Sequence, residues 1–296
     1  MVFFVAITLS FIISTIWSGG GRKNHSSFLD AKEQGNIQIL LNKEGDITIS
    51  MEEYICMSLC VAIPIEYELE CLKAQAVLLR TNIIYEYKEQ TEDKISDPIF
   101  INDAYGSKSQ LEGLWGTDYM ENYEKVKKAV EETRGIYMIY QGEPIFASYF
   151  RVSGGQTRDG SELLSLPCPY LKSVDCKKDY LSEDYLSKYT IKEKELETLL
   201  GGKIVEIVRD QAGYCLFLVM EDGTEYPGEW FREQLNLNSA HITFQKQEKE
   251  YVLIVKGLGH GLGMSQYGAN EMALEGKTYD EILTHFFQNI RFDKYD

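Results

Sequence analysis

The first 18 residues of the chain carry no charged side chain, and this run limits what the N-terminus can form. As a helix it would extend roughly 27 Å at about 1.5 Å per residue, close to the ~30 Å hydrocarbon layer of a bilayer. Trp17 lies at its end, where an aromatic ring would meet the membrane interface. Because no small-residue cleavage motif follows, the run predicts an uncleaved transmembrane anchor over residues 1–18.

The residues after the run predict a linker and then a folded domain. Residues 18–27 are rich in Gly and Ser, so we assign residues 19–34 to a linker and residues 35–296 to one domain. Hydrophobic spacing predicts a hairpin over 37–49 and helices over 51–62, 69–90, 118–134 and 279–289. Strands are expected at 136–140, 144–149, 203–208, 215–221 and 242–255. Helices and strands interleave without a regular βαβ order, which predicts an α+β fold of mixed helices and antiparallel strands.

Charge and cysteine content exclude several classes of protein. The formal net charge is −16, so binding to the phosphate backbone of nucleic acids is disfavoured. Six cysteines are too few for a disulfide scaffold in 296 residues. Cys168 and Cys176 are close enough for a local disulfide or half of a metal site, although free thiols are the simpler interpretation.

Two long motifs carry a family resemblance. Residues 70–81 read ECLKAQAVLLRT and residues 257–269 read GLGHGLGMSQYGA, and between them lie AVEETRG (129–135), SGGQT (153–157) and FREQL (231–235). In order and spacing these motifs resemble the stage II sporulation protein D and amidase-enhancer family over residues 45–295.

The resemblance implies an extracytoplasmic protein, held in the cell membrane by one pass, that acts on peptidoglycan during spore engulfment. The implied activity is that of a lytic transglycosylase, which cleaves glycan strands stripped of their stem peptides, around a glycan-binding cleft. The implied partners are the glycan strands, the membrane, and the companion sporulation amidase and membrane protein. No cofactor is implied. Residues 101–107 lack the Cys and His that hold a metal in some relatives, so no metal is expected.

Ala62 departs from the family pattern at the position that matters most for catalysis. The family has a Glu two residues before the first proline, and that Glu is the general acid that protonates the leaving oxygen. Here the tripeptide is Ala62-Ile63-Pro64, and alanine has no proton to donate. Three interpretations follow: a non-catalytic glycan-binding member; an active transglycosylase in which Glu66, Glu68 or Glu70 is a displaced acid; or an active enzyme altered at this position. A scaffold or amidase enhancer with no glycan contact is a further alternative.

The remaining site predictions concern glycan contact rather than proton transfer. Lys73 and Arg80 lie two turns apart on one helix face, where they could bind sugar oxygens or be ordinary ion-paired cations. His260 lies in a glycine-rich turn, where it could contact a ligand or simply hold the turn by hydrogen bonds. By resemblance, the predicted glycan-binding residues are Lys73, Gln75, Arg80, Ser153, His260, Ser265, Gln266 and Tyr267.

Overall fold

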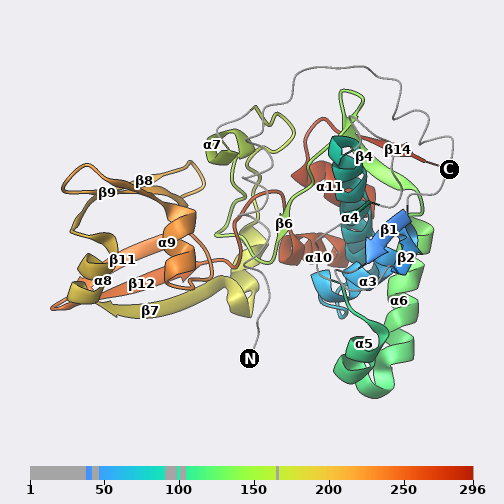
Figure 1. Ribbon diagram of the computed structural model, residues 1–296, viewed down its shortest axis with the longest axis horizontal. Coiled ribbons are helices and arrows are strands. Elements are labelled where there is room, and N and C mark those ends of the chain that lie inside the picture. The colour runs from blue at the N-terminus through green and yellow to red at the C-terminus, as the bar shows by residue number, and fades with distance from the viewer. Residues whose placement is uncertain (1–37, 42–46, 91–98, 101–104, 165–166, 296) are drawn as a thin grey trace. The chain divides into compact units, whose positions relative to one another are not determined.

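The computed structural model describes residues 38–41, 47–90, 99–100, 105–164 and 167–295, which form two compact units (Figure 1). We call residues 148–271 and 285–288 the sheet unit, and the described residues up to 147 together with 272–284 and 289–295 the helical unit. The domain expected from residue 35 thus comprises two units. The anchor and linker predicted over residues 1–34 lie outside the described residues.

The helical unit is built around two helices that the hydrophobic spacing predicts correctly. Helix α3 (Met51–Ala62) begins where the Ser50 hydroxyl accepts a hydrogen bond from the Glu53 amide, and it ends at Ile63, which is extended ahead of Pro64. Helix α4 (Leu69–Gln90) is buried on all sides in its middle, where every residue from 74 to 81 is buried. The unit also contains α5 (Lys108–Trp115), the 3₁₀ turn η1 (Gly116–Asp118) and α6 (Tyr119–Glu132). Helix α11 (Tyr279–Phe286) belongs to it up to Thr284.

Two small sheets complete the helical unit. One has the order β2–β1–β3, and the other the order β14–β4–β5. Their strands are β1 (Gln38–Leu41), β2 (Ile47–Ser50), β3 (Ile99–Phe100), β4 (Ile136–Tyr140), β5 (Glu143–Pro144) and β14 (Arg291–Lys294). The hairpin expected over 37–49 is confirmed by the antiparallel pairing of β1 with β2.

The strand expected over 144–149 is shorter than predicted. Strand β5 ends at Pro144, and the next strand, β6, begins at Tyr149. Between them, Asn82 of α4 donates to the Ala147 carbonyl and accepts from the Ala147 amide, both at 2.8 Å. The backbone at Ala147 is therefore bonded to a helix side chain and not to a neighbouring strand.

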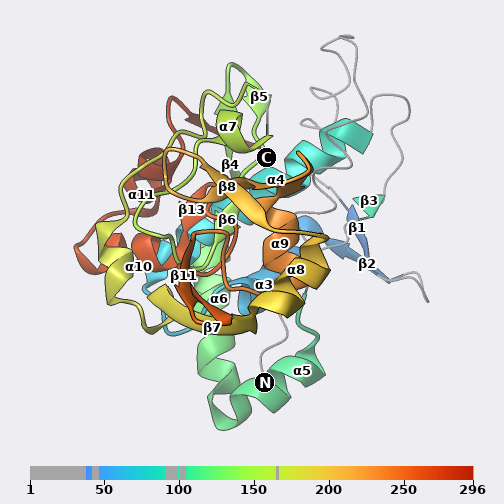
Figure 2. The ribbon, with the colours of Figure 1, turned by 90° about the vertical axis from the view of Figure 1, so that its left-hand side faces the viewer.

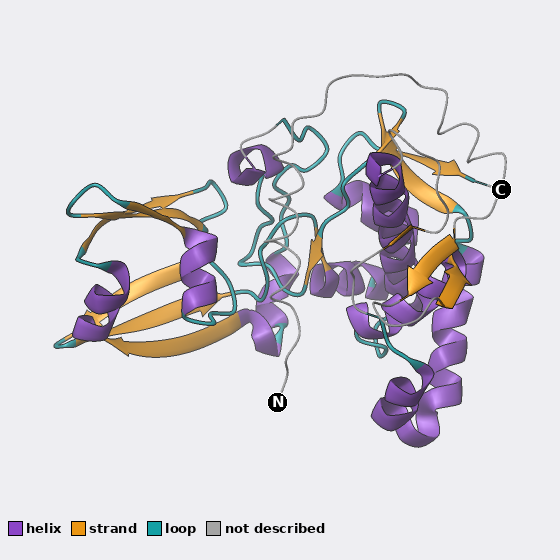
Figure 3. Cartoon of the chain, in the orientation of Figure 1, coloured by secondary structure: helices purple, strands orange, loops and turns teal. Residues whose placement is uncertain are grey.

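The sheet unit holds two three-stranded antiparallel sheets, β10–β9–β8 and β11–β12–β7 (Figure 3). Their strands are β7 (Leu186–Lys192), β8 (Ile204–Arg209), β9 (Cys215–Met220), β10 (Glu225–Pro227), β11 (Ile242–Gln247) and β12 (Glu250–Lys256). A parallel pair, β6 (Tyr149–Phe150) with β13 (Met264–Ser265), lies beside the glycine-rich segment. The short helices are α7 (Gly160–Leu164), η2 (Lys177–Leu181), η3 (Glu183–Tyr185), α8 (Glu193–Leu200) and α9 (Gly228–Gln234). Helix α10 (Gln266–Leu274) belongs to this unit up to Glu271.

Two expected boundaries in this part of the chain are wrong. The strand expected over 242–255 is a hairpin, since Glu248 adopts a left-handed backbone with a φ of 51° between β11 and β12. The helix expected over 279–289 ends at Phe286, and Asn289, with a φ of 58°, leads into β14.

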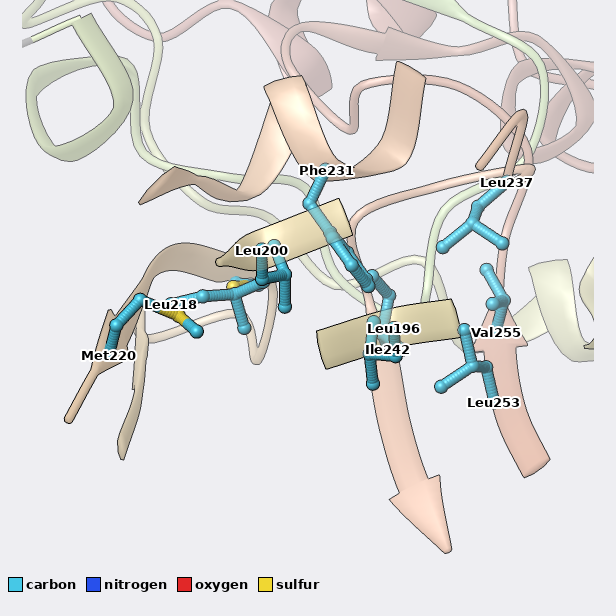
Figure 4. Packing of buried hydrophobic residues seen from close by; sticks show 10 residues of the cluster. Leu196, Leu200, Leu218, Met220, Phe231, Leu237, Ile242, Leu253 and Val255 are labelled. Carbon is cyan, nitrogen blue, oxygen red and sulfur yellow. The ribbon is translucent and has the colours of Figure 1, made fainter. Parts of the chain in front are cut away.

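The core of the two three-stranded sheets is formed by side chains from both sheets and from α8 and α9 (Figure 4). Phe231 of α9, Leu218 of β9 and Leu253 of β12 are fully buried in it. Burying each such side chain stabilises the fold by about 1.5–3 kcal/mol. The mixture of helices and antiparallel sheets confirms the expected α+β class.

Candidate functional site

Ala62 is the last residue of α3, directly before the extended Ile63 and Pro64 that end the helix. Its side chain is partly buried. The methyl group occupies the position at which the resemblance places the general acid. A carboxylic acid is therefore absent from this point of the chain.

Glu66 and Glu70, two of the three predicted substitutes for the acid, have very different surroundings. Glu66 is exposed in the turn after Pro64. Glu70 lies in the first turn of α4, where its Oε1 accepts from Lys73 Nζ at 2.6 Å and its Oε2 accepts from the Tyr279 amide at 2.9 Å. Both oxygens of Glu70 thus accept hydrogen bonds from groups of the helical unit, so this carboxyl group acts as a structural acceptor.

Lys73 links the start of α4 to the end of α6. Its ammonium contacts Glu70 at 2.6 Å and Glu132 at 2.5 Å, and its side chain is 13% exposed. Burial alone would lower the pKa of Lys73, but the Glu132 and Glu70 carboxylates raise it above its ordinary value. Lys73 is thus a charged group at the protein surface that is fixed in position by two acids.

Arg80, two turns further along α4, is completely buried. Its Nε and Nη2 donate to the two carboxylate oxygens of Glu52 at 2.9 and 2.7 Å, and its Nη1 donates to the Ile136 carbonyl at 3.0 Å. Gln75 is buried as well. These contacts are structural, and sugar binding by Arg80 and Gln75 stays a prediction.

The predicted site residues of the sheet unit are joined by Asp179, which the sequence reasoning did not single out. Its Oδ2 accepts from the Ser153 amide and from the Ser265 hydroxyl, both at 2.6 Å. Burial raises the pKa of Asp179, although these hydrogen bonds partly oppose the shift. No local motif marks Asp179, because it lies 26 residues from Ser153 and 86 from Ser265.

His260 holds the glycine-rich turn. Its Nδ1 accepts from the Leu262 amide at 3.1 Å, and its carbonyl accepts from Arg158 at 3.3 Å. Burial, together with Arg232 and Arg158, lowers the pKa of His260 to about 3, so the ring is neutral near pH 7. These bonds favour the turn-holding interpretation of His260 over direct ligand contact.

The glycines of this turn are required by close packing. A Cβ at Gly263 would lie 2.0 Å from the Ser148 carbonyl oxygen, and one at Gly261 would lie 2.7 Å from the Tyr214 ring. Both residues also have φ values near 80°.

Gln266 and Tyr267 begin α10 directly after the turn. Gln266 is buried, whereas Tyr267 is only partly buried and its amide donates to the Arg151 carbonyl at 3.0 Å. Burial and the nearby carboxylates of Glu271 and Asp179 raise the pKa of Tyr267. Tyr267 therefore keeps a neutral hydroxyl that can both donate and accept hydrogen bonds.

Neither the cysteines nor the acids form a metal site in the described part of the chain. Cys168 and Cys176 are buried free thiols, as are the other four cysteines. Within the described ranges, no three His, Cys, Asp or Glu side chains are placed to hold a metal ion together. None of the helices described here combines the length and apolar character needed to cross a bilayer.

These features define a class of α+β protein. Its helical unit carries a helix with the sequence KAQA (residues 73–76, on α4), and its sheet unit carries the glycine-rich turn. The Stage II sporulation protein (SpoIID) family model matches residues 46–140. Stage II sporulation protein D of Bacillus amyloliquefaciens is 33% identical over 259 residues, covering 84% of this chain and 75% of the relative. The corresponding protein of Bacillus subtilis (strain 168) is also 33% identical over 84% of this chain and 76% of its own length.

A more distant relative extends the comparison. The amidase enhancer of Bacillus subtilis (strain 168) is 25% identical over 78% of this chain and 39% of its own length. The chain belongs to the stage II sporulation protein D family.

Proposed function

We propose that this chain is an extracytoplasmic peptidoglycan-binding protein of spore engulfment that holds glycan strands without cutting them. Family membership supports the sporulation-related, peptidoglycan-associated role. The observation that carries the non-catalytic part is the alanine at position 62 on α3. The bonded carboxylate of Glu70, the nearest substitute on α4, supports the same view.

Glycan contact in this proposal depends on Lys73 and Tyr267, the two predicted glycan-binding residues that are only partly buried. Lys73 presents an oriented ammonium that can bind the acetamido and lactyl oxygens of amino sugars. Tyr267 combines an aromatic face with a neutral hydroxyl, a combination suited to the alternating apolar and polar faces of a sugar ring. Ser153, His260 and Ser265 hold the backbone of the sheet unit in place, and the buried Arg80 does the same in the helical unit.

Residues 1–18 are proposed to anchor the chain in the cell membrane by a single pass, with both units outside the cytoplasm. The absence of charge along this run supports the anchor. The name of the amidase enhancer relative supports a further element of the proposal, that the chain associates with a sporulation amidase.

Co-sedimentation with peptidoglycan sacculi whose stem peptides have been removed tests this function. The full chain is expected to sediment with the sacculi and to release no anhydro-muramyl products. Lys73→Gln should lower the affinity of the chain for the sacculi by roughly tenfold, which corresponds to about 1.4 kcal/mol of binding free energy. Lys127→Gln is the matched control, because Lys127 is also paired with an acid on a helix but is 48% exposed on α6.

Two results would contradict the proposal. Release of anhydro products that is abolished by Glu66→Gln or Glu70→Gln would establish an active transglycosylase with a displaced acid. Failure to bind sacculi, combined with retention of the amidase, would leave a scaffold without glycan contact.

A further inference from the structure

The turn that joins α5 to α6 exposes an unusual amount of apolar surface. Leu114 is 69% exposed and Met120 is 64% exposed, the two highest values among the large apolar side chains that the structure describes. They flank the 3₁₀ turn η1, and Figures 1 and 2 show α5 beside the first turns of α6. We call residues 108–124 the α5–α6 tip.

A row of aromatic rings supports this surface from within the tip. The centroids of Trp115 and Tyr119 lie 6.2 Å apart, and those of Tyr119 and Tyr123 lie 5.8 Å apart with the rings stacked. All three side chains are partly buried. Burial, with Cys56 and Cys60 of α3 nearby, raises the pKa of Tyr123 to about 12. The three rings therefore form a continuous row within the tip.

The charges around the apolar side chains are predominantly negative. The exposed acids of the tip are Glu112, Asp118, Glu121 and Glu124, against one exposed cation, Lys108. The next cation along α6, Lys125, is occupied elsewhere, since its ammonium donates to the Ile65 and Tyr67 carbonyls at 2.8 and 2.6 Å. The α5–α6 tip thus carries exposed apolar and acidic side chains together with partly buried aromatic rings in one short segment of the chain.

We propose that the α5–α6 tip is a docking surface for a basic amphipathic segment of another protein. Leu114 and Met120 would contact the apolar side chains of that segment, and the acids would pair with its Lys and Arg residues. Partly exposed aromatic rings also attract cations through their faces. The same charge disfavours anionic partners, including nucleic acids, acidic lipids and the lactyl carboxylates of denuded glycan. This surface is separate from the residues assigned to glycan contact, so its role does not depend on the proposed function.

Titration calorimetry of the full chain with a synthetic Leu/Lys amphipathic helical peptide tests the assignment. Leu114→Ser combined with Met120→Ser should weaken binding at least about tenfold, as expected for apolar contacts at the centre of an interface. Val205→Ser with Leu274→Ser is the matched control, because each of these side chains is 59% exposed outside the tip, and binding should be unchanged. Equal weakening in both double variants would show non-specific association and overturn the proposal.

The acids are tested by the same titration. Glu121→Gln with Glu124→Gln should weaken binding and reduce its dependence on salt, whereas the exposed pair Glu221→Gln with Glu225→Gln should leave both unchanged. A Leu/Glu peptide of the same length should not bind. Sedimentation of the tip variants with denuded sacculi is measured in parallel. Loss of sacculus binding, with peptide binding retained, would assign the tip to glycan instead and overturn the proposal.

Discussion

Arg80 of α4 and Glu52 of α3 form a two-bond ion pair in the interior of the helical unit, with distances of 2.9 and 2.7 Å. Glu52 Oε1 also accepts from the Tyr295 hydroxyl at 2.6 Å and from the Gly135 amide at 3.3 Å. Arg80 in turn donates to Ile136, the first residue of β4. One buried pair therefore connects α3, α4, the start of β4 and the segment after β14.

Removing the cation of this pair should strongly destabilise the protein. Arg80→Leu leaves the Glu52 carboxylate buried without its main partner, and breaking a buried pair in this way costs about 3–5 kcal/mol. The free energy of unfolding from chemical denaturation measures the effect. Lys127→Gln, on the exposed face of α6, should cost less than about 1 kcal/mol. A similar small loss for Arg80→Leu would show that the pair does not stabilise the fold.

Because of Glu52, we expect the free energy of unfolding to fall at acidic pH. Burial alone would raise the pKa of Glu52, but Arg80 and Tyr295 hold it below the ordinary value of 4.5. The folded state then binds protons less readily than the unfolded state, so this stabilisation is present above pH 4.5 and is lost as the pH falls through the folded pKa. Between pH 6 and pH 3, the free energy of unfolding of the Glu52→Gln variant should depend less on pH than that of the unaltered protein.

Because of His260, we expect the stability to depend on pH in a higher pH range as well. Its folded pKa of about 3 lies below the ordinary value of 6.5, so the unfolded state takes up a proton first on acidification. Stability should fall by up to about 1.4 kcal/mol per pH unit below pH 6.5 because of this residue. His260→Gln should reduce that slope, and the exposed His285→Gln should leave it unchanged. An NMR titration of the His260 ring between pH 5 and 8 would contradict this account.

Asp179 is expected to stabilise the sheet unit by accepting hydrogen bonds from Ser153 and Ser265. Asp179→Ala removes the oxygen that accepts both hydrogen bonds, and each buried donor left without a partner costs about 1–3 kcal/mol. Asp179→Asn keeps an acceptor oxygen and should cost less. Thermal unfolding monitored by circular dichroism compares the two variants, and equal melting temperatures would argue against a role for these bonds.

Restoring the acid tests the catalytic interpretation directly. If only the proton donor is missing, Ala62→Glu should produce cleavage of denuded glycan at least about 10²–10⁴-fold above the unaltered chain. Anhydro-muramyl products, separated by chromatography, provide the measurement. Ala62→Gln is the control, since it has a similar size without a transferable proton. An inactive Ala62→Glu variant that binds sacculi would show that further groups required for cleavage are absent.

Local patterns in the sequence predicted the long helices well. The spacing of apolar residues set the limits of α3 and α4, and Pro64 set the end of α3, because backbone sterics act over neighbouring residues. The apolar spacing failed at two points for different reasons. After β5, the backbone of Ala147 bonds to Asn82, which lies 65 residues away, and at Glu248 a local left-handed turn divides a strand that hydrophobicity alone predicts as continuous.

The sequence by itself determined the family, the α+β class and the alanine at position 62, since each is a property of residue identity and local spacing. Only the tertiary structure decided that Arg80 is a buried structural cation while Lys73 reaches the surface, although both lie on α4. It also decided that Asp179 joins Ser153 to Ser265. Burial and hydrogen-bond partners depend on segments brought together from 26 to 86 residues away, which no local pattern encodes.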